Sequence, residues 1–308
     1  MSTNTILSSI GRTPLVQLRQ LVPANCADIF IKLEYFNPTG SYKDRMALAI
    51  IENAEKRGDL KAGMQVVECT GGSTGTSLAL VCAAKGYKFK AISSDAFAKE
   101  KLKAIQTFGG DLEIVASEGE KITPDLIPRM IARAETLSSQ PGTYWTNQFK
   151  NKDAFEGYKP IGTEIVNQLT RPVDAFCAAV GTAGMAIGVA MELKKHDANT
   201  KVILLEPASA PLLSAGTKGS HKVEGIGVGM IPPLLDKTYY DSVRTVAEKD
   251  AREMAKLLVS KEGIFAGTST GMNVAAAIEI GKQLSAGHTV VTVACDSGMK
   301  YISGGLFD

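Results

Sequence analysis

Short apolar runs alternate along the chain with longer segments in which apolar residues recur at helical spacing. The apolar runs predict buried strands at residues 28–34, 64–69, 88–93, 111–116, 173–180, 201–207 and 288–295. The segments of helical period, several of which end in Gly, predict helices at residues 43–58, 74–86, 99–110 and 122–137. This repeated alternation predicts an α/β fold with mainly parallel sheets covered by helices on both faces.

The domain organisation follows from the same alternation. No low-complexity tract or flexible linker interrupts it, so a domain boundary must be a crossover between two sheets. A chain of 308 residues is long enough for two domains. We predict a smaller domain at residues 41–147 and a larger domain formed by residues 1–40 and 148–308, each a three-layer α/β/α unit.

Composition and charge narrow the classes of function. Hydrophobic residues make up 44% of the chain and charged residues 21%, which is typical of a globular protein. The 34 basic and 32 acidic residues are spread along the chain, and no basic run suggests binding to nucleic acid. The N-terminal segment has no basic stretch followed by an apolar run, so we expect neither export nor membrane anchoring.

The cysteines and histidines predict neither a disulfide framework nor a metal site. Cys26, Cys69, Cys82, Cys177 and Cys295 are odd in number, widely spaced and form no C-x-x-C pair. The three histidines have no metal-ligand spacing. We therefore expect a cytoplasmic protein without a bound metal.

Three glycine-rich stretches follow predicted strands, at residues 69–75, 180–188 and 266–273. A helix that starts after a tight Gly turn presents unpaired backbone N–H groups and the positive end of its dipole to an anion. For each stretch taken alone, a tight turn that needs Gly explains the glycines as well as an anion site does. Three of them at the carboxyl ends of strands favour a ligand site. None matches the dinucleotide or nucleoside triphosphate pattern, so a smaller phosphate or carboxylate is expected.

Lys43 lies in the segment KLEYFNPTGSYKDR, residues 32–45, at the start of a predicted helix. Such lysines are usually solvated surface residues. Here an apolar strand end and several candidate anion cradles are expected nearby, and this environment can lower the pKa of a lysine enough to form a Schiff base. The cofactor that combines a lysine Schiff base with a phosphate site is pyridoxal phosphate.

The same segment resembles the cofactor-lysine segment of the cysteine synthase and cystathionine β-synthase family. Members of this family are fold-type II pyridoxal-phosphate enzymes with the tryptophan synthase β-subunit fold. Further segments resemble the family in order along almost the whole chain: IGRTPLVQL (10–18), TGGSTG (70–75), NQFKN (147–151), GTAGM (181–185), VEGIGVGMIPPLLD (223–236), GTSTG (267–271) and DSGMKYISGGLF (296–307). The resemblance implies a tryptophan synthase β-subunit-like α/β fold and, as is usual in the family, a homodimer.

The resemblance also implies roles for particular residues. Lys43 would bind the cofactor as a Schiff base and then remove the α-proton of the substrate. Ser269 would face the pyridine nitrogen, and this neutral hydroxyl would favour elimination over transamination. The residues implied for the cofactor phosphate are Gly181, Thr182, Ala183, Gly184 and Met185, and those implied for the substrate carboxylate are Thr70, Gly71, Gly72, Ser73, Thr74 and Gln148.

Four positions depart from the family pattern. Gly71 replaces a Ser, and Ser73 replaces an Asn that ordinarily reaches both the cofactor and the substrate carboxylate, which leaves fewer donors. Met185 replaces a Thr of the phosphate site but keeps its backbone N–H. Glu224 occupies the position of a Gln in many members. Its carboxyl group could protonate a poor leaving group such as hydroxide, or it is a surface residue of a loop.

The expected activity is a β-replacement that makes cysteine or a related thioether amino acid. The substrates would be O-acetylserine, or another serine derivative, and sulfide or a thiol. One alternative is a lyase, either a cysteine desulfhydrase or a serine-using enzyme like cystathionine β-synthase. Another alternative is a scaffold that binds cofactor without turnover, although Lys43 and Ser269 argue against it. Turnover on different serine derivatives, with and without sulfide, separates these hypotheses.

Overall fold

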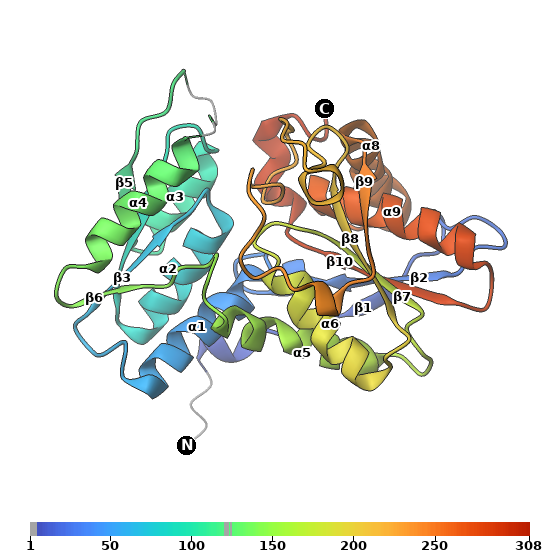
Figure 1. Ribbon diagram of the computed structural model, residues 1–308, viewed down its shortest axis with the longest axis horizontal. Helices are drawn as coiled ribbons and strands as arrows, with labels where there is room; N and C mark the ends of the chain where they lie inside the picture. Colours follow the sequence, from blue (N-terminus) through green and yellow to red (C-terminus); the bar gives the residue numbers. More distant parts are fainter. Residues whose placement is uncertain (1–4, 120–122, 124) are drawn as a thin grey trace. The chain divides into compact units, whose positions relative to one another are not determined.

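The computed structural model describes residues 5–119, 123 and 125–308, and the chain divides into two compact units (Figure 1). The first unit comprises Met1–Ile10 and Lys43–Gly157, and the second comprises Gly11–Tyr42 and Tyr158–Asp308. Residues 1–10 fall in the first unit because Leu7, in the 3-10 helix η1 (Ile6–Ser9), packs against its core. No helix in the described ranges is long and apolar enough to cross a membrane.

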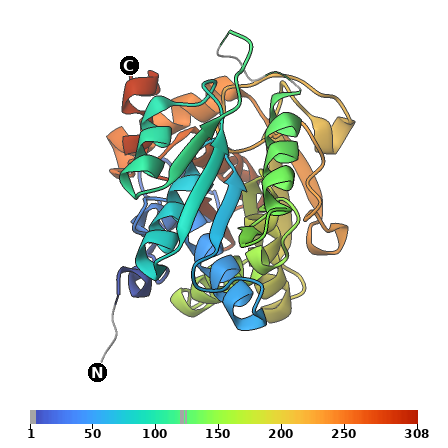
Figure 2. The same ribbon diagram turned by 90° about the vertical axis from the view of Figure 1, so that its left-hand side faces the viewer.

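The first unit is built on a four-stranded parallel sheet with the order β5-β4-β3-β6. Helices α2 and α3 lie on one face of this sheet and α4 lies on the other (Figure 2). Strand β3 is buried between them from Val66 to Cys69. The elements of this unit are β3 (Gln65–Cys69), β4 (Lys88–Ser93), β5 (Asp111–Ile114), β6 (Thr143–Trp145), α1 (Lys43–Arg57), α2 (Ser73–Lys85), α3 (Lys99–Thr107) and α4 (Leu126–Ser138).

The second unit has a six-stranded sheet with the order β1-β2-β10-β7-β8-β9, in which only the β1–β2 pair is antiparallel. The strands are β1 (Leu15–Gln17), β2 (Asp28–Leu33), β7 (Ala175–Ala179), β8 (Lys201–Pro207), β9 (Ser242–Val246) and β10 (Thr289–Ala294). The central strands β7 and β10 are buried along their whole length.

Helices cover both faces of the second sheet, with α8 and α9 on one face and α6 on the other (Figure 1). Helix α5 begins in the first unit and ends in the second. The helices are α5 (Asp153–Gln168), α6 (Gly184–His196), α7 (Leu212–Ala215), α8 (Glu248–Leu257) and α9 (Thr268–Leu284), with the π-helix η4 (Leu258–Glu262) and the 3-10 helices η2 (Glu34–Phe36), η3 (Lys237–Tyr239) and η5 (Gly298–Gly304).

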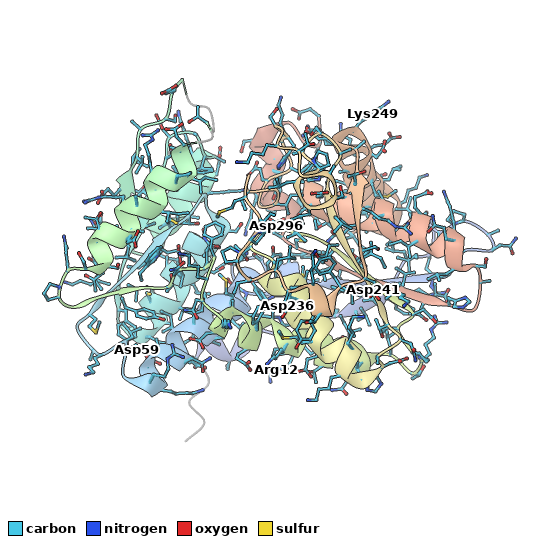
Figure 3. The ribbon with its side chains drawn as sticks, viewed as in Figure 1. Arg12, Asp59, Asp236, Asp241, Lys249 and Asp296 are labelled. Carbon is cyan, nitrogen blue, oxygen red and sulfur yellow. The ribbon has the colours of Figure 1, made fainter. Side chains whose placement is uncertain are left out.

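The predicted α/β fold with mainly parallel sheets is confirmed, and each of the seven predicted strands is present. Three strands, β1, β6 and β9, were not predicted. Strand β9 is held by Asp241 (Figure 3), which accepts hydrogen bonds from Val202 N at 2.8 Å and Lys194 Nζ at 2.9 Å. The third predicted helix ends at Thr107 rather than at residue 110, because Gly109 turns the chain with a φ of 85°. The predicted start of the fourth helix, at residue 122, lies outside the described residues.

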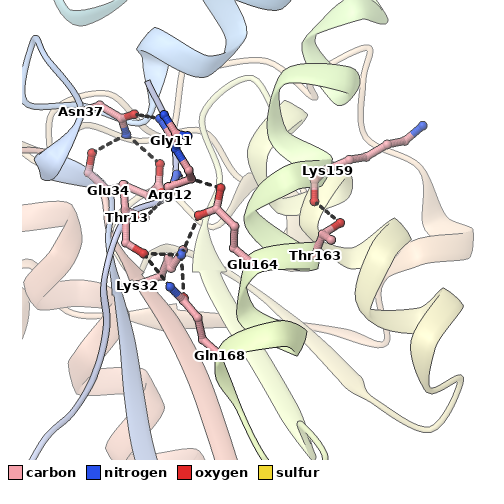
Figure 4. Close-up of polar contacts among 10 residues, drawn as sticks. All are labelled: Gly11, Arg12, Thr13, Lys32, Glu34, Asn37, Lys159, Thr163, Glu164 and Gln168. Carbon is pink, nitrogen blue, oxygen red and sulfur yellow. Dashed lines mark hydrogen bonds and ion pairs between the residues drawn. The ribbon is translucent and has the colours of Figure 1, made fainter. Parts of the chain in front are cut away.

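A buried cation fixes the beginning of the second unit (Figure 4). Lys32 of β2 has no exposed surface, and its Nζ lies 2.7 Å from Glu164 Oε2 of α5. The same Nζ donates to Thr13 O at 2.6 Å and to Gln168 Oε1 at 2.8 Å. A buried ammonium requires such partners, because desolvation without them costs several kcal/mol.

A second set of bonds holds the segment that leads from β2 to Lys43 (Figure 4). The Glu34 carboxylate accepts from Thr13 Oγ1 at 2.7 Å and from Asn37 Nδ2 at 2.9 Å. Asn37 Oδ1 in turn accepts from Gly11 N at 2.8 Å. The turn before Lys43 is therefore held by buried side chains of the second unit, in addition to backbone bonds such as that from Ser297 N to Gly40 O.

We predict that Lys32→Met lowers the free energy of unfolding by about 3 kcal/mol, because it leaves a largely buried Glu164 without its cation. The measurement is denaturant unfolding. The control is Lys195→Met, which breaks an ion pair whose lysine side chain is 78% exposed and should cost less than about 0.5 kcal/mol. Equal losses in the two variants would contradict a structural role for the buried pair.

Candidate active site

The second unit contains the predicted phosphate cup at the carboxyl end of its central strand β7. Residues 180–183 connect this strand to α6, whose first N–H groups have no partner within the helix. A Cβ added at Gly181 would lie 2.3 Å from Gly225 O, so only glycine fits. Ala183 has a left-handed φ of 67°, which turns the chain into the helix. The backbone geometry thus fits a small anion such as a phosphate group.

Ser269 lies in the first turn of α9 and is buried. The start of this helix is fixed by Asn273, whose Oδ1 accepts from Ala179 N at 2.8 Å and whose Nδ2 donates to Val293 O at 2.8 Å. Asn273 therefore joins α9 to the ends of the adjacent strands β7 and β10. The structure thus brings Ser269 and the phosphate cup to the carboxyl edge of the same sheet. Asn273 ends the glycine-rich stretch at residues 266–273, and no local pattern in the sequence indicates its structural role.

Glu224 lies in a loop that runs beside the phosphate cup. Gly227 N donates to Val180 O at 3.0 Å, and Gly225 makes the close approach to Gly181. His221 stabilises the loop by contacting Gly227 O at 3.1 Å, so this histidine is structural. Glu224 itself is exposed.

The first unit contains the predicted carboxylate loop, residues 70–74, which comprises the turn after β3 and the first two residues of α2. Thr70 Oγ1 accepts from Gly72 N at 3.0 Å and from Gly75 N at 3.1 Å, which shapes the turn. Thr74 Oγ1 donates to Gln148 Oε1 at 2.7 Å. Gln148 is distant in sequence, and this hydrogen bond brings its side chain to the loop.

The structure explains why glycine occupies position 71. A Cβ added there would lie 2.8 Å from Cε1 of Phe97, so the ring of Phe97 fills the space that a Ser side chain would need. A Cβ at Gly72 would lie 2.7 Å from Cβ of Lys101, and Gly72 also has a φ of 146° that other residues rarely adopt. Phe97 is a residue that the sequence analysis missed.

Lys43 is the first residue of α1 and is buried at 9% exposure. The residues before it belong to the second unit, where Tyr42 N donates to Cys295 O at 3.2 Å and Ser41 pairs with Asp296 (Figure 3). Tyr42 is therefore bound at the carboxyl end of β10. Burial, followed by the charges of Cys295 and Asp296, raises the pKa of the Tyr42 hydroxyl well above its usual value, so it stays neutral.

The fold and these turns are those of an α/β protein in which backbone N–H groups suited to an anion lie at the carboxyl ends of parallel strands. The family model described as pyridoxal-phosphate dependent enzyme matches residues 6–296, and the chain belongs to this family. The protein is therefore a pyridoxal-phosphate-dependent enzyme, and the resemblance found in the sequence is confirmed.

Three relatives illustrate the similarity. The chain is 40% identical over 306 residues to a cysteine synthase of Staphylococcus aureus, covering 99% of this chain and 97% of the relative. The crystal structure of a cysteine synthase from Entamoeba histolytica has a TM-score of 0.92 at 32% identity, covering 100% of this chain and 91% of that one. An O-acetylserine dependent cystathionine β-synthase from Helicobacter pylori has a TM-score of 0.92 at 30% identity, covering 100% of both chains.

We predict that Gly71→Ser destabilises the protein by about 1–3 kcal/mol, because the new Cβ collides with Phe97. Adding Phe97→Ala should make the effect of Gly71→Ser smaller, and a double-mutant cycle of unfolding free energies measures this coupling. Gly304→Ser is the control, because nothing lies within 4 Å of a Cβ added there. A cost for Gly71→Ser that is unchanged by Phe97→Ala would show that this contact does not exclude Ser.

Proposed function

We propose that the protein catalyses β-replacement, joining a serine derivative to sulfide or a thiol to make cysteine or a related thioether amino acid. O-acetylserine is the leading donor. The observation that carries this proposal is the bonded group formed by Thr74 and Gln148 beside the start of α2, which suits the carboxylate of an amino acid. The names of the similar proteins support the same class of reaction.

The residues that would hold the cofactor are those implied by the family resemblance. Residues 181–185 would bind its phosphate through backbone N–H groups and the Thr182 hydroxyl, and Ser73 and Ser269 would contact its ring. Lys43 would hold it covalently. The exchange of Thr for Met at position 185 removes a hydroxyl but leaves the N–H of the helix start, so the phosphate keeps that donor.

Pyridoxal phosphate, when bound, supplies the electron withdrawal that acidifies the α-hydrogen of an amino acid. The Lys43 amine would accept that proton as general base. The hydroxyl of Ser269 can offer the ring nitrogen a hydrogen bond but not a negative charge, which favours loss of the β-substituent over transamination. Residues 70–74 and Gln148 would hold the substrate carboxylate and orient the α-hydrogen toward Lys43.

A lyase using serine or cysteine is a second candidate, and the position of Glu224 favours it. The loop of this residue contacts the phosphate cup through Gly225 and Gly227, so its carboxyl group could approach a leaving group. Activity of the purified holoenzyme on serine, O-acetylserine, O-phosphoserine and cysteine, each with and without sulfide, separates replacement from elimination. No turnover on any of these amino acids would overturn both candidates.

We further propose a cytoplasmic homodimer. The five cysteines are all free and buried, which suits a reducing compartment. The second unit exposes the large apolar side chains of Phe36, Met299 and Ile302, and the cysteine synthase family resemblance supports a dimer. Light scattering of the purified protein tests the oligomeric state.

Lys43 is predicted to carry the cofactor. Borohydride reduction of the holoenzyme followed by peptide mapping should place the pyridoxyl label on Lys43, and Lys43→Ala should lose the label and at least about 100-fold in turnover. Lys56→Ala, an exposed change on the same helix, is the control. A label on another lysine, or none, would exclude the proposed role of Lys43.

Glu224→Gln is predicted to impair turnover of serine about 100-fold or more while affecting O-acetylserine little, because hydroxide needs a proton to leave and acetate does not. The ratio of the two rates is the measurement, since a loss of cofactor would lower both together. Equal losses, or no activity of the unmodified enzyme on serine, would leave Glu224 as a loop residue.

A further inference from the structure

Glu68 is a fully buried carboxylate in the penultimate position of β3. Its Oε1 accepts from Cys69 N at 2.8 Å, and its Oε2 accepts from Thr146 Oγ1 at 2.6 Å and from Gln148 N at 2.9 Å. In the part of the chain that the structure describes, no lysine or arginine forms an ion pair with it. A buried carboxylate without a cation is costly, and hydrogen-bond donors offset only part of that cost.

The donors that bind Glu68 come from the ends of two neighbouring strands. Cys69 ends β3, whereas Thr146 and Gln148 directly follow β6, which pairs with β3 in parallel. Asn147, between the two donors of the second strand, has a left-handed φ of 47°. This turn is uncommon for a residue other than glycine and needs bonds on both sides to hold it.

The side chain of Gln148 then returns to the carboxylate loop. Its Nε2 donates to Cys69 O at 2.9 Å, and its Oε1 accepts from Thr74 Oγ1 at 2.7 Å. Both bonds together fix the orientation of the amide, and one of its two N–H groups is used by Cys69 O. Glu68 holds the backbone of Gln148, and Gln148 connects that backbone to the start of α2.

We propose that Glu68 is a positioning residue for substrate recognition. It fixes the turn at Asn147 so that the amide of Gln148, together with Thr74 and the start of α2, binds the carboxylate of the amino-acid substrate. This inference rests on the proposed function and deepens it, since it assigns carboxylate recognition to a residue that does not itself touch the substrate.

A carboxylate is required here because both of its oxygens face donors. In Glu68→Gln, the amide nitrogen must face either Cys69 N or the pair formed by Thr146 and Gln148, so two donors meet whichever way the amide rotates. Burial has the largest effect and raises the pKa of Glu68 above its usual value, and the bonds from Thr146, Gln148 and Cys69 offset part of this rise in favour of the ionised form.

The experiment compares Glu68→Gln with the unmodified holoenzyme. The absorbance of the bound cofactor is titrated with L-serine and O-acetylserine to give dissociation constants, and KM and kcat are measured alongside. We expect the dissociation constant and KM for the amino acid to rise about tenfold or more. The cofactor absorbance without substrate and the KM for sulfide should stay unchanged. Glu135→Gln, an exposed carboxylate of α4 in the same unit, is the control.

A purely structural role would instead lower cofactor content, kcat and thermal stability together without this selective loss. Thr146→Val and Thr146→Ser give a second test if Glu68→Gln does not fold. Valine removes the donor to Glu68 and should weaken amino-acid binding more than serine, which keeps the hydroxyl.

The outcomes separate this inference from the proposed function. If no amino acid changes the cofactor absorbance of the unmodified enzyme, the proposed function is wrong. If the unmodified enzyme binds amino acids and Glu68→Gln binds them equally well, the positioning role alone is overturned.

Discussion

In each unit, one buried polar side chain binds the backbone where two parallel strands end, and the rest of the site depends on it. Beyond the last ladder bond, the N–H and C=O groups of a strand are still buried and need partners. Asn273 satisfies Ala179 N and Val293 O in the second unit, and Glu68 satisfies Cys69 N in the first. An unpaired group at such a position costs about 1–3 kcal/mol. Because Asn273 and Glu68 pair these backbone groups, they fix where α9 starts and where the loop before α2 starts.

The anion sites themselves are made mostly of backbone. Gly181 is required because Gly225 O would lie 2.3 Å from any Cβ, and this close approach places the loop of Glu224 beside the cup. Donors from backbone N–H groups do not change with the side chain, so Met185 can replace a hydroxyl residue without removing the N–H at its position.

The sequence predicted those parts of the fold in which one segment determines its own structure. Strands β7 and β10 are uniformly apolar and buried, and this pattern is visible in the sequence. Strand β6 has only three residues and β9 is half-exposed at the edge of its sheet, so their pairing depends on neighbours that a local pattern does not contain. The glycine-rich stretches likewise indicated anion cradles, because a tight turn and the helix start after it are determined by a few consecutive residues.

The residues that position the site were harder to predict because their partners are distant in the chain. Glu68 does give a signal, since it is a single charged residue within a buried run, but its donors at residues 146 and 148 become neighbours only when β3 pairs with β6. Asn273 likewise lies in a largely apolar helix, and its role appears only with the sheet in place.

The contact between Phe97 and Gly71 changes how the segment TGGSTG, residues 70–75, is interpreted. In the sequence, Gly71 stands where the family pattern has a Ser, and the missing hydroxyl suggests weaker binding of the substrate carboxylate. In the structure, the ring of Phe97 occupies the space of the missing side chain, so the loop loses a donor but remains packed. The donors that remain for the proposed recognition of a carboxylate are the backbone at the start of α2, Thr74 and the Gln148 amide. The proposed role of Glu68 follows from this arrangement, because its carboxylate holds the backbone of Gln148 at 2.9 Å.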